Sequence, residues 1–328
     1  MASTPQVRHY SVDAESAGQR LDNFLLRELK GVPKTHVYRI IRSGEVRINK
    51  GRAQADTRLQ AGDLVRVPPI RLSEKIEAKQ AQPVPAREFP VLFEDPAFIA
   101  INKPAGVAVH GGSGVSFGVI EQLRRSRPDA ALLELVHRLD RETSGVLLVA
   151  KKRSALKALQ DQFRERETAK TYLALVKGAW PANKKVIDQP LHKYLLPDGE
   201  RRVRVTSADD PDGMRSITLV KVMGAVRLPE PWLGGNPPLL TLLAVTIKTG
   251  RTHQIRVHLA SNGHPIAGDD KYGDFDLNRL LQKNGLKRMF LHAWQLGLIH
   301  PVSQQALQLQ ADLPPELKSW GGVADFFV

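Results

Sequence analysis

The pattern of apolar and polar positions between residues 18 and 70 predicts two helices followed by two strands. Apolar residues recur every three or four positions in two stripes, Leu21, Phe24, Leu25 and Leu29 and then Val37, Tyr38, Ile40 and Ile41. This spacing places each stripe on one face of a helix. The second stripe stops at Gly44, a residue typical of helix ends. Residues 46–49 and 64–67 alternate instead, which predicts a pair of strands.

From Phe89 onward, the pattern predicts short strands and helices in irregular alternation. Residues 91–95 and 98–102 predict a strand pair that turns at Asp95 and Pro96. Further apolar runs that predict strands lie at 146–150, 170–176 and 239–247. We expect a helix after the first of these runs, capped by Ser154, with Leu156, Leu159 and Phe163 on one side. No glycine-rich loop joins a strand to a helix, so neither a Rossmann domain nor a P-loop is expected.

These patterns divide the chain into four segments and predict an α+β fold. The segments are an N-terminal extension at 1–17, a small unit at 18–70, a linker at 71–88 and a large unit at 89–328. The linker is polar, holds two prolines and has no sustained periodicity. In the large unit we expect a mixed, largely antiparallel central sheet flanked by helices. Residues 228–238, rich in proline and glycine, predict an extended loop.

The net charge of the chain indicates which class of partner it binds. The formal net charge is +14, and residues 18–70 alone hold eleven Lys or Arg against five Asp or Glu. An excess of this size favours binding to polyanions, of which nucleic acid is the commonest in cells. The charges could also simply be the solvated faces of two short helices.

Other features of the composition exclude several kinds of site. The chain has no cysteine, which excludes disulfides, iron–sulfur clusters and cysteine nucleophiles. No apolar run approaches the roughly 20 residues of a membrane-spanning helix. Residues 1–17 lack the apolar core of a signal peptide. We therefore expect a cytoplasmic protein with no membrane contact.

Residues 136–145 (VHRLDRETSG) carry the first candidate chemistry. Asp140 lies between Arg138 and Arg141, in a loop that precedes a buried strand. Positive neighbours keep such a carboxylate ionised, so that it can act as a nucleophile or a base. A structural ion pair is the plainer interpretation of any single Asp near Arg.

Residues 248–259 (KTGRTHQIRVHL) carry the second candidate. The segment leaves a strand at Gly250 and enters a helix, in which Arg256 can point back toward the sheet edge. Its histidines, His253 and His258, do not follow the HExxH spacing of a zinc helix, and no acidic residue separates them. No metal site is expected here.

Taken in order, the motifs resemble the RluA-type family of pseudouridine synthases over roughly residues 90–300. They are 102–106 (NKPAG), 137–140 (HRLD) with 143–145 (TSG), 170–172 (KTY), 250–259, and 263–266 (GHPI) with Asp269 and 271–273 (KYG). The small unit resembles an S4 RNA-binding domain, through 20–22 (RLD), 43–49 (SGEVRIN) and 62–63 (GD). Together with 108–114 (AVHGGSG), this points to the branch of the family that modifies bacterial 23S rRNA.

The resemblance implies a role for three residues in catalysis. Asp140 corresponds to the catalytic aspartate, and Arg256 to the arginine that pairs with it. Tyr172 corresponds to the tyrosine that stacks on the target base and helps to remove the C5 proton. The aspartate either traps the sugar at C1′ or removes a C2′ proton to give a glycal, and the sequence does not choose between these routes. Neither route needs a cofactor.

The resemblance also implies residues that contact the RNA. Those expected at the flipped nucleotide are Arg138, Arg251, Ile255 and His137, with Arg251 a second candidate for the ion pair or for a phosphate contact. Those expected on the S4 unit are Arg20, Lys34, Arg39, Arg42, Arg47 and Lys50. The expected partner is 23S rRNA or a large-subunit assembly intermediate, bound by a monomer.

Three other functions remain possible on the sequence. One is another RluA-type enzyme, acting on other rRNA or tRNA uridines. A second is a non-catalytic S4 protein of ribosome assembly, which leaves Asp140, Tyr172 and Arg256 unexplained together. The third is a serine hydrolase, because 114–118 (GVSFG) matches GxSxG, although Ser116 does not lie between a buried strand and a helix as that fold requires.

Overall fold

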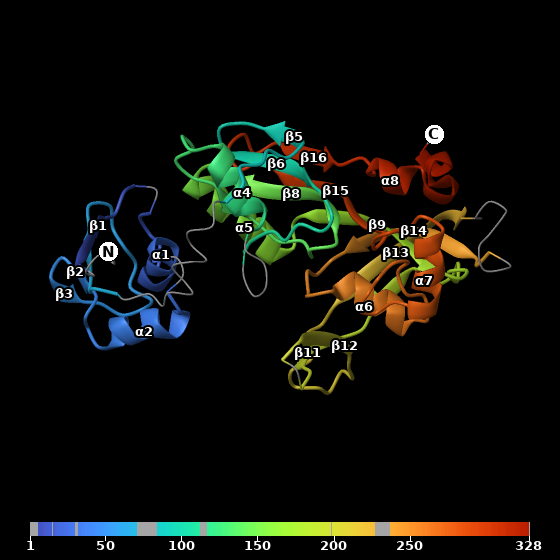
Figure 1. Cartoon of the computed structure of the whole chain (residues 1–328), viewed down its shortest axis with the longest axis horizontal. Helices are drawn as coiled ribbons and strands as arrows, with labels where there is room; N and C mark the ends of the chain where they lie inside the picture. The colour runs from blue at the N-terminus through green and yellow to red at the C-terminus, as the bar shows by residue number, and fades with distance from the viewer. Residues whose placement is uncertain are drawn as a thin grey trace. The chain divides into compact units, whose positions relative to one another are not determined.

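The computed structural model describes residues 6–14, 16–29, 32–70, 84–111, 117–197, 199–226 and 237–327. The chain forms two compact units, Met1–Pro85 and Ala86–Val328 (Figure 1). Most of the predicted linker at 71–88, most of the predicted loop at 228–238, and Ser116 lie outside the described residues. The segment boundaries expected from the sequence stay predictions.

The small unit packs two helices against a four-stranded sheet. The predicted helices are confirmed as α1 (Leu21–Glu28) and α2 (Lys34–Arg42), and the predicted strand pair as β2 (Arg47–Ile48) and β4 (Leu64–Val67). The sheet order is β1-β4-β2-β3, completed by β1 (Arg8–Ser11) and β3 (Gly51–Arg52). The sequence did not predict β1, since this edge strand has no buried residue and therefore no apolar alternation.

The large unit is built on a ten-stranded sheet (Figure 1). Its main path runs β10-β13-β14-β9-β15-β8-β6-β5, with β16 beside β15 and β7 beside β8. The strands are β5 (Val91–Glu94), β6 (Phe98–Lys103), β7 (Glu134–Leu135), β8 (Ser144–Ala150), β9 (Ala169–Lys177), β10 (Val186–Asp188), β13 (Ile217–Val226), β14 (Leu240–Ile247), β15 (Leu291–Ile299) and β16 (Ala306–Gln310). Among the pairs of described strands only β8 and β15 run parallel, so the expected mixed, largely antiparallel sheet is confirmed.

Helices cover both faces of this sheet. Side chains alternate along β6 and β8, so that one face packs against α5 (Arg153–Glu165) and the other against α4 (Val119–Ser126). In the same way, α6 (Gln254–Ser261) and α7 (Phe275–Lys283) cover opposite faces of β9 and β14. The chain continues after β16 into α8 (Pro315–Lys318) and a 3₁₀ helix, η1 (Trp320–Phe327).

Several parts of the large unit differ from the sequence prediction, which did not include strands β13, β15 and β16 or helices α4 and α7. Helix α5 starts one residue before Ser154, and Lys152 occupies the cap position without a side-chain hydrogen bond, so the predicted Ser154 cap is wrong. A separate hairpin, β11 (Leu191–Leu195) and β12 (Arg201–Val205), was not predicted; it projects from the unit beside α6 (Figure 1). Its buried Leu191 and Val203 pack against Val257 of α6.

Candidate active site

Asp140 lies in the loop between β7 and β8, and its position follows from how that loop is held. The seven residues of β8 are all buried, which fixes the end of the loop. The Thr143 amide donates to the Asp140 carbonyl at 3.1 Å. From β6, the buried Lys103 ammonium donates to the carbonyls of Pro104, Val107 and Arg141 at 2.9, 2.8 and 3.1 Å. Burial lowers the pKa of Lys103 to about 7, while three accepting carbonyls favour its charged form.

A turn after β14 delivers α6 to the same place. Gln254, buried at the start of the helix, accepts from the Thr249 hydroxyl at 2.7 Å and from the Arg251 amide at 3.1 Å. His253, just before the helix, has a φ of 52°, in the left-handed region. This turn directs the first residues of α6 toward the sheet edge, where Asp140 lies.

Arg256 of α6 connects two carboxylates. Its guanidinium donates to both oxygens of Asp269 at 2.8 and 2.7 Å, and to Asp140 Oδ2 at 3.3 Å. Although burial opposes it, hydrogen bonding to Asp269 raises the pKa of Arg256. Asp269 is fully buried and also accepts from the amides of Lys271 and Tyr272. Arg256 is therefore held by Asp269 and presents its remaining positive edge to Asp140.

The sequence assigned Asp269 no role, although it stands in the last motif that carries the family resemblance. The expected Arg256–Asp140 pair exists, but Asp269 is the closer partner of Arg256. The missed signal is chemical: a buried arginine needs a buried carboxylate, and the partly exposed Asp140 does not suffice.

A cavity of about 620 Å³, open mouth included, lies over Asp140. Tyr172 of β9, Ile255 of α6 and Leu291 of β15 form its apolar wall. Arg138 and Arg251 add positive charge at its border, and Arg251 Nε is buried with no hydrogen-bond partner among the described residues. Burial raises the pKa of Tyr172, and the charge of Asp140 adds to the effect. The cavity thus combines an apolar wall, a carboxylate and cationic groups, which suits a base with its ribose phosphate.

Six of the seven residues expected at the nucleotide line this one cavity: Asp140, Tyr172, Arg256, Arg138, Arg251 and Ile255. The exception is His137, whose ring stacks on Phe163 of α5 at 4.6 Å between centroids. Its Nε2 accepts from the Leu148 amide at 3.1 Å, and burial lowers its pKa to about 4. His137 is placed to hold the loop against the sheet rather than to touch substrate.

The residues expected to bind RNA on the small unit differ in their exposure and in their ion pairs. Arg20 is tied to Asp22 at 2.7 Å, and Arg39 lies 3.5 Å from Glu45. Arg47 is half-buried on β2. The exposed ones are Lys34, Arg39 and Arg42 on α2 and Lys50 in the turn after β2. Among the six expected residues, the exposed cations therefore lie on α2 and that turn.

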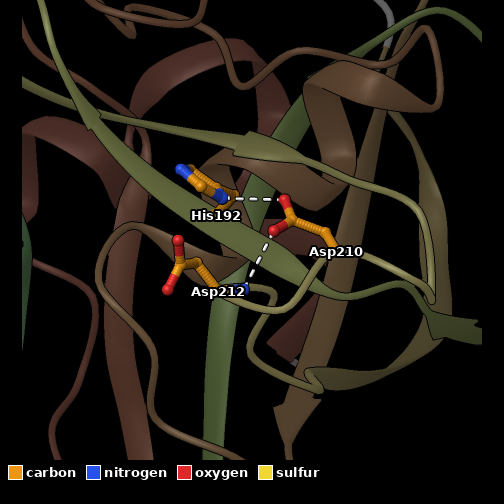
Figure 2. Close-up of side chains that lie close together, drawn as sticks. All are labelled: His192, Asp210 and Asp212. Atoms are coloured by element: carbon orange, nitrogen blue, oxygen red, sulfur yellow. Dashed lines mark hydrogen bonds and ion pairs between the residues drawn. The ribbon is translucent and has the colours of Figure 1, made fainter.

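One group of possible metal ligands occurs in the part of the chain that the structure describes, namely His192, Asp210 and Asp212 (Figure 2). Asp210 Oδ2 already contacts His192 Nδ1 at 2.7 Å and accepts from the Thr206 hydroxyl at 2.6 Å. Its Oδ1 accepts from the Asp212 amide at 2.9 Å. These bonds hold the turn after β12, and the group lies outside the cavity over Asp140.

The chain is similar to known pseudouridine synthases in sequence. Residues 97–261 match the model of the RNA pseudouridylate synthase family, and residues 19–65 match the S4 domain. The chain is 50% identical to ribosomal large subunit pseudouridine synthase C of Pasteurella multocida over 315 residues, covering 95% of this chain and 92% of that one. It is 49% identical to the enzyme of the same name from Escherichia coli K12 over 320 residues, covering 96% of each.

A solved structure has a similar fold. That of human RNA pseudouridylate synthase domain containing 1 superposes with a TM-score of 0.57 at 25% identity, covering 73% of this chain and 91% of that one. All the residues that line the cavity except Leu291 lie within residues 97–261, the segment that matches the family model. The described residues contain no helix long and apolar enough to span a membrane.

Proposed function

Because the chain belongs to the RNA pseudouridylate synthase family, we propose that it isomerises uridines of large-subunit ribosomal RNA to pseudouridine, with Asp140 as its catalytic residue. The observation that carries the proposal is the position of Asp140: a half-exposed carboxylate, at the floor of an apolar-walled cavity, held by an arginine that is itself fixed by a buried aspartate. The large-subunit substrate is supported by the names of the two bacterial relatives.

The reaction makes clear demands on such a site. The N1–C1′ bond breaks, the uracil turns, C5 bonds to C1′, the C5 proton leaves and N1 gains one. Positive character develops at the sugar, which a carboxylate stabilises or traps. Asp140 either adds to C1′ or takes a C2′ proton; the cavity accommodates both routes. The uracil, once flipped out of its stack, meets Tyr172 and Ile255.

The cationic border of the cavity suits the backbone of the flipped nucleotide. Arg138 is exposed at the rim, and Arg251 has one buried donor still unpaired among the described atoms. A buried donor without a partner costs free energy, and a phosphate oxygen would satisfy it. We assign Arg251 to a phosphate contact rather than to the Asp140 ion pair, which Arg256 makes.

The small unit contributes RNA affinity in this proposal. Its exposed cations on α2 and the turn after β2 neutralise phosphates without reading bases. The substrate is 23S rRNA or a large-subunit assembly intermediate. The protein binds it as a monomer in the bacterial cytoplasm. Size-exclusion chromatography with light scattering checks the monomer.

The test of the proposed function is pseudouridine mapping by carbodiimide and reverse transcription on unmodified 23S rRNA. We expect stops with the wild type and none with Asp140→Asn, which keeps the shape of the side chain and removes its charge. Asp276→Asn, an exposed aspartate on α7, is the matched control and keeps the stops. Tight binding with no stops from the wild type would reject the enzyme and favour a non-catalytic assembly protein.

A further inference from the structure

The two oxygens of the Asp140 carboxylate have different surroundings. Arg256 Nη1 lies 3.3 Å from Oδ2, and His253 Nε2 lies 3.8 Å from the same oxygen. No hydrogen bond from the described residues reaches Oδ1. The closest contacts of Arg256 and His253 are therefore with Oδ2, and Oδ1 receives no hydrogen bond.

His253 is held where its side chain can donate a hydrogen bond to Asp140 Oδ2. Its backbone is in the left-handed region at the start of α6, and its carbonyl accepts from the Val257 amide at 2.9 Å. Left-handed backbone at a residue other than glycine persists only where the surroundings enforce it, and such residues cluster at functional sites. Burial lowers the pKa of His253, so the ring is neutral and only one of its nitrogens carries a proton.

Tyr272 decides which nitrogen carries that proton. The Tyr272 oxygen accepts from the Val203 amide of β12 at 3.1 Å and lies 2.8 Å from His253 Nδ1. With the Val203 amide already donating to it, the phenol can direct its own proton to Nδ1. A Nδ1 that accepts leaves the proton on Nε2, and Nε2 is the nitrogen that faces Asp140.

We propose that Tyr272 and His253 form a positioning pair that holds Asp140 by Oδ2, with the His253 Nε2–H as donor, and leaves Oδ1 as the oxygen that reacts. The inference rests on the proposed function, in which Asp140 is catalytic. The 3.8 Å separation exceeds a hydrogen bond and closes when the nucleotide is bound, as catalytic contacts commonly do. Oδ1 then adds to C1′ or accepts the C2′ proton. In either route the carboxylate loses its charge, and Oδ2 becomes the carbonyl oxygen that accepts from His253 and Arg256.

The arrangement also connects the β11–β12 hairpin to the catalytic residue. Hydrogen bonds run from the Val203 amide to Tyr272 and between Tyr272 and His253, and His253 faces Asp140 at 3.8 Å. A second bond, from Arg202 to the Lys271 carbonyl at 2.5 Å, fastens the same hairpin to the loop that holds Tyr272. A displacement of the hairpin therefore changes the support of Asp140.

Two amide substitutions of His253 separate this role from a structural one. The amide nitrogen of Gln lies near the place of Nε2, and that of Asn near the place of Nδ1. Asn tolerates left-handed backbone better than Gln does, so a purely structural role favours His253→Asn. A donor at Nε2 favours His253→Gln.

The assay is single-turnover release of tritium from rRNA labelled at uridine C5, measured over a range of enzyme concentrations. We expect His253→Asn to lower the maximal rate about 10- to 100-fold, the worth of one hydrogen bond to a charged group. We expect the half-saturating concentration to stay unchanged, and His253→Gln to recover most of the rate. If the two variants are equally slow, if Asn is the faster, or if the loss is in half-saturation alone, the inference is wrong.

Tyr272→Phe tests the second member of the pair. It should slow the wild type, yet add little to His253→Gln, because an amide has no tautomer to be set. Tyr194→Phe, on the same hairpin, is the control for loss of a tyrosine hydroxyl and should leave the rate unchanged. Independent, multiplying effects of Tyr272→Phe and His253→Gln would overturn the pairing. Absence of tritium release from the wild type would instead reject the proposed function.

Discussion

The surroundings of Tyr172 distinguish between the two roles that the family resemblance implies for it, stacking on the base and removal of the C5 proton. It lies on β9 between Val245 of β14 and Ala293 of β15, and its ring borders the cavity over Asp140. Burial and the neighbouring carboxylate raise the pKa of its phenol. A phenol that stays protonated can stack and donate a hydrogen bond, but it is a poor acceptor of the C5 proton. Of the two roles implied by the family resemblance, the structure favours stacking.

We therefore expect Tyr172→Phe to keep most of the single-turnover rate, because the ring is preserved. Tyr172→Leu should lose about 5- to 150-fold, the worth of stacking one base on an aromatic ring. Since the pKa is raised above its ordinary 10, the wild-type rate should show no step from tyrosine ionisation between about pH 7 and pH 10. Equal losses in the two variants, or a rate that climbs through this range only when Tyr172 is present, would restore the role in proton removal.

The sequence identified candidate residues that stand in a family motif and missed residues that act through another residue. Asp140 was chosen through the family resemblance, because an aspartate between arginines is by itself more simply a structural ion pair. Asp269, His253 and Tyr272 depend on contacts that only the fold creates: the Arg256–Asp269 contact spans 13 residues, and the His253–Tyr272 contact spans 19. For His137 the motif was visible, but the direction of its side chain was not.

At the scale of elements, Gly145 sets the approach of β8 and β15. The two strands are parallel neighbours there, and Gly145 pairs with Ala293 at a φ of 111°. A Cβ on Gly145 would lie 2.1 Å from the Ala293 carbonyl oxygen. Because backbone atoms cannot give way as a flexible side chain can, the strands would have to separate. The strand that carries the end of the Asp140 loop would move with them.

We expect Gly145→Ala to lower the free energy of unfolding of the large unit by about 3 kcal/mol or more. The matched control is Gly263→Ala, where φ is 81° but no atom lies within 4 Å of the added Cβ. That control should lose only about 1 to 2 kcal/mol, the cost of left-handed backbone. Urea unfolding followed by circular dichroism measures both. Similar losses would mean that dihedral strain, and not the strand contact, makes glycine necessary.

Helices and strands could be predicted where their own buried side chains form an apolar run or stripe in the sequence. Strands β8, β9 and β14 are buried on both faces and read as apolar runs, and α1 and α2 read as stripes. The β11–β12 hairpin gives no such signal, since it buries little beyond Leu191 and Val203 and depends on α6 and Tyr272 for its support. The start of α5 was misplaced because Ser154 satisfies the residue preference for a cap, while the backbone begins the helix earlier.

At the scale of the whole molecule, the excess of positive charge is divided between two units with different tasks. The large unit carries the cavity and the proposed catalytic groups, and the small unit carries exposed cations but no described part of that cavity. Phosphate contacts release counterions, so each one adds to the dependence of affinity on salt. The small unit should therefore supply affinity for long RNA, and the chemistry should not depend on it.

We expect residues 86–328 alone to fold, shown by a cooperative thermal transition, and to bind 23S rRNA more weakly and with a shallower salt dependence than the full chain. In the full chain, Lys34→Gln, Arg42→Gln and Lys50→Gln together should reduce the slope of log affinity against log salt by about 2, for three contacts to single-stranded RNA. The triple variant keeps the fold, so it separates lost charge from lost structure. An unfolded fragment would show that the large unit needs the small one for stability. An unchanged slope in the triple variant would move the RNA surface away from α2 and the turn after β2, leaving the large unit to make the phosphate contacts.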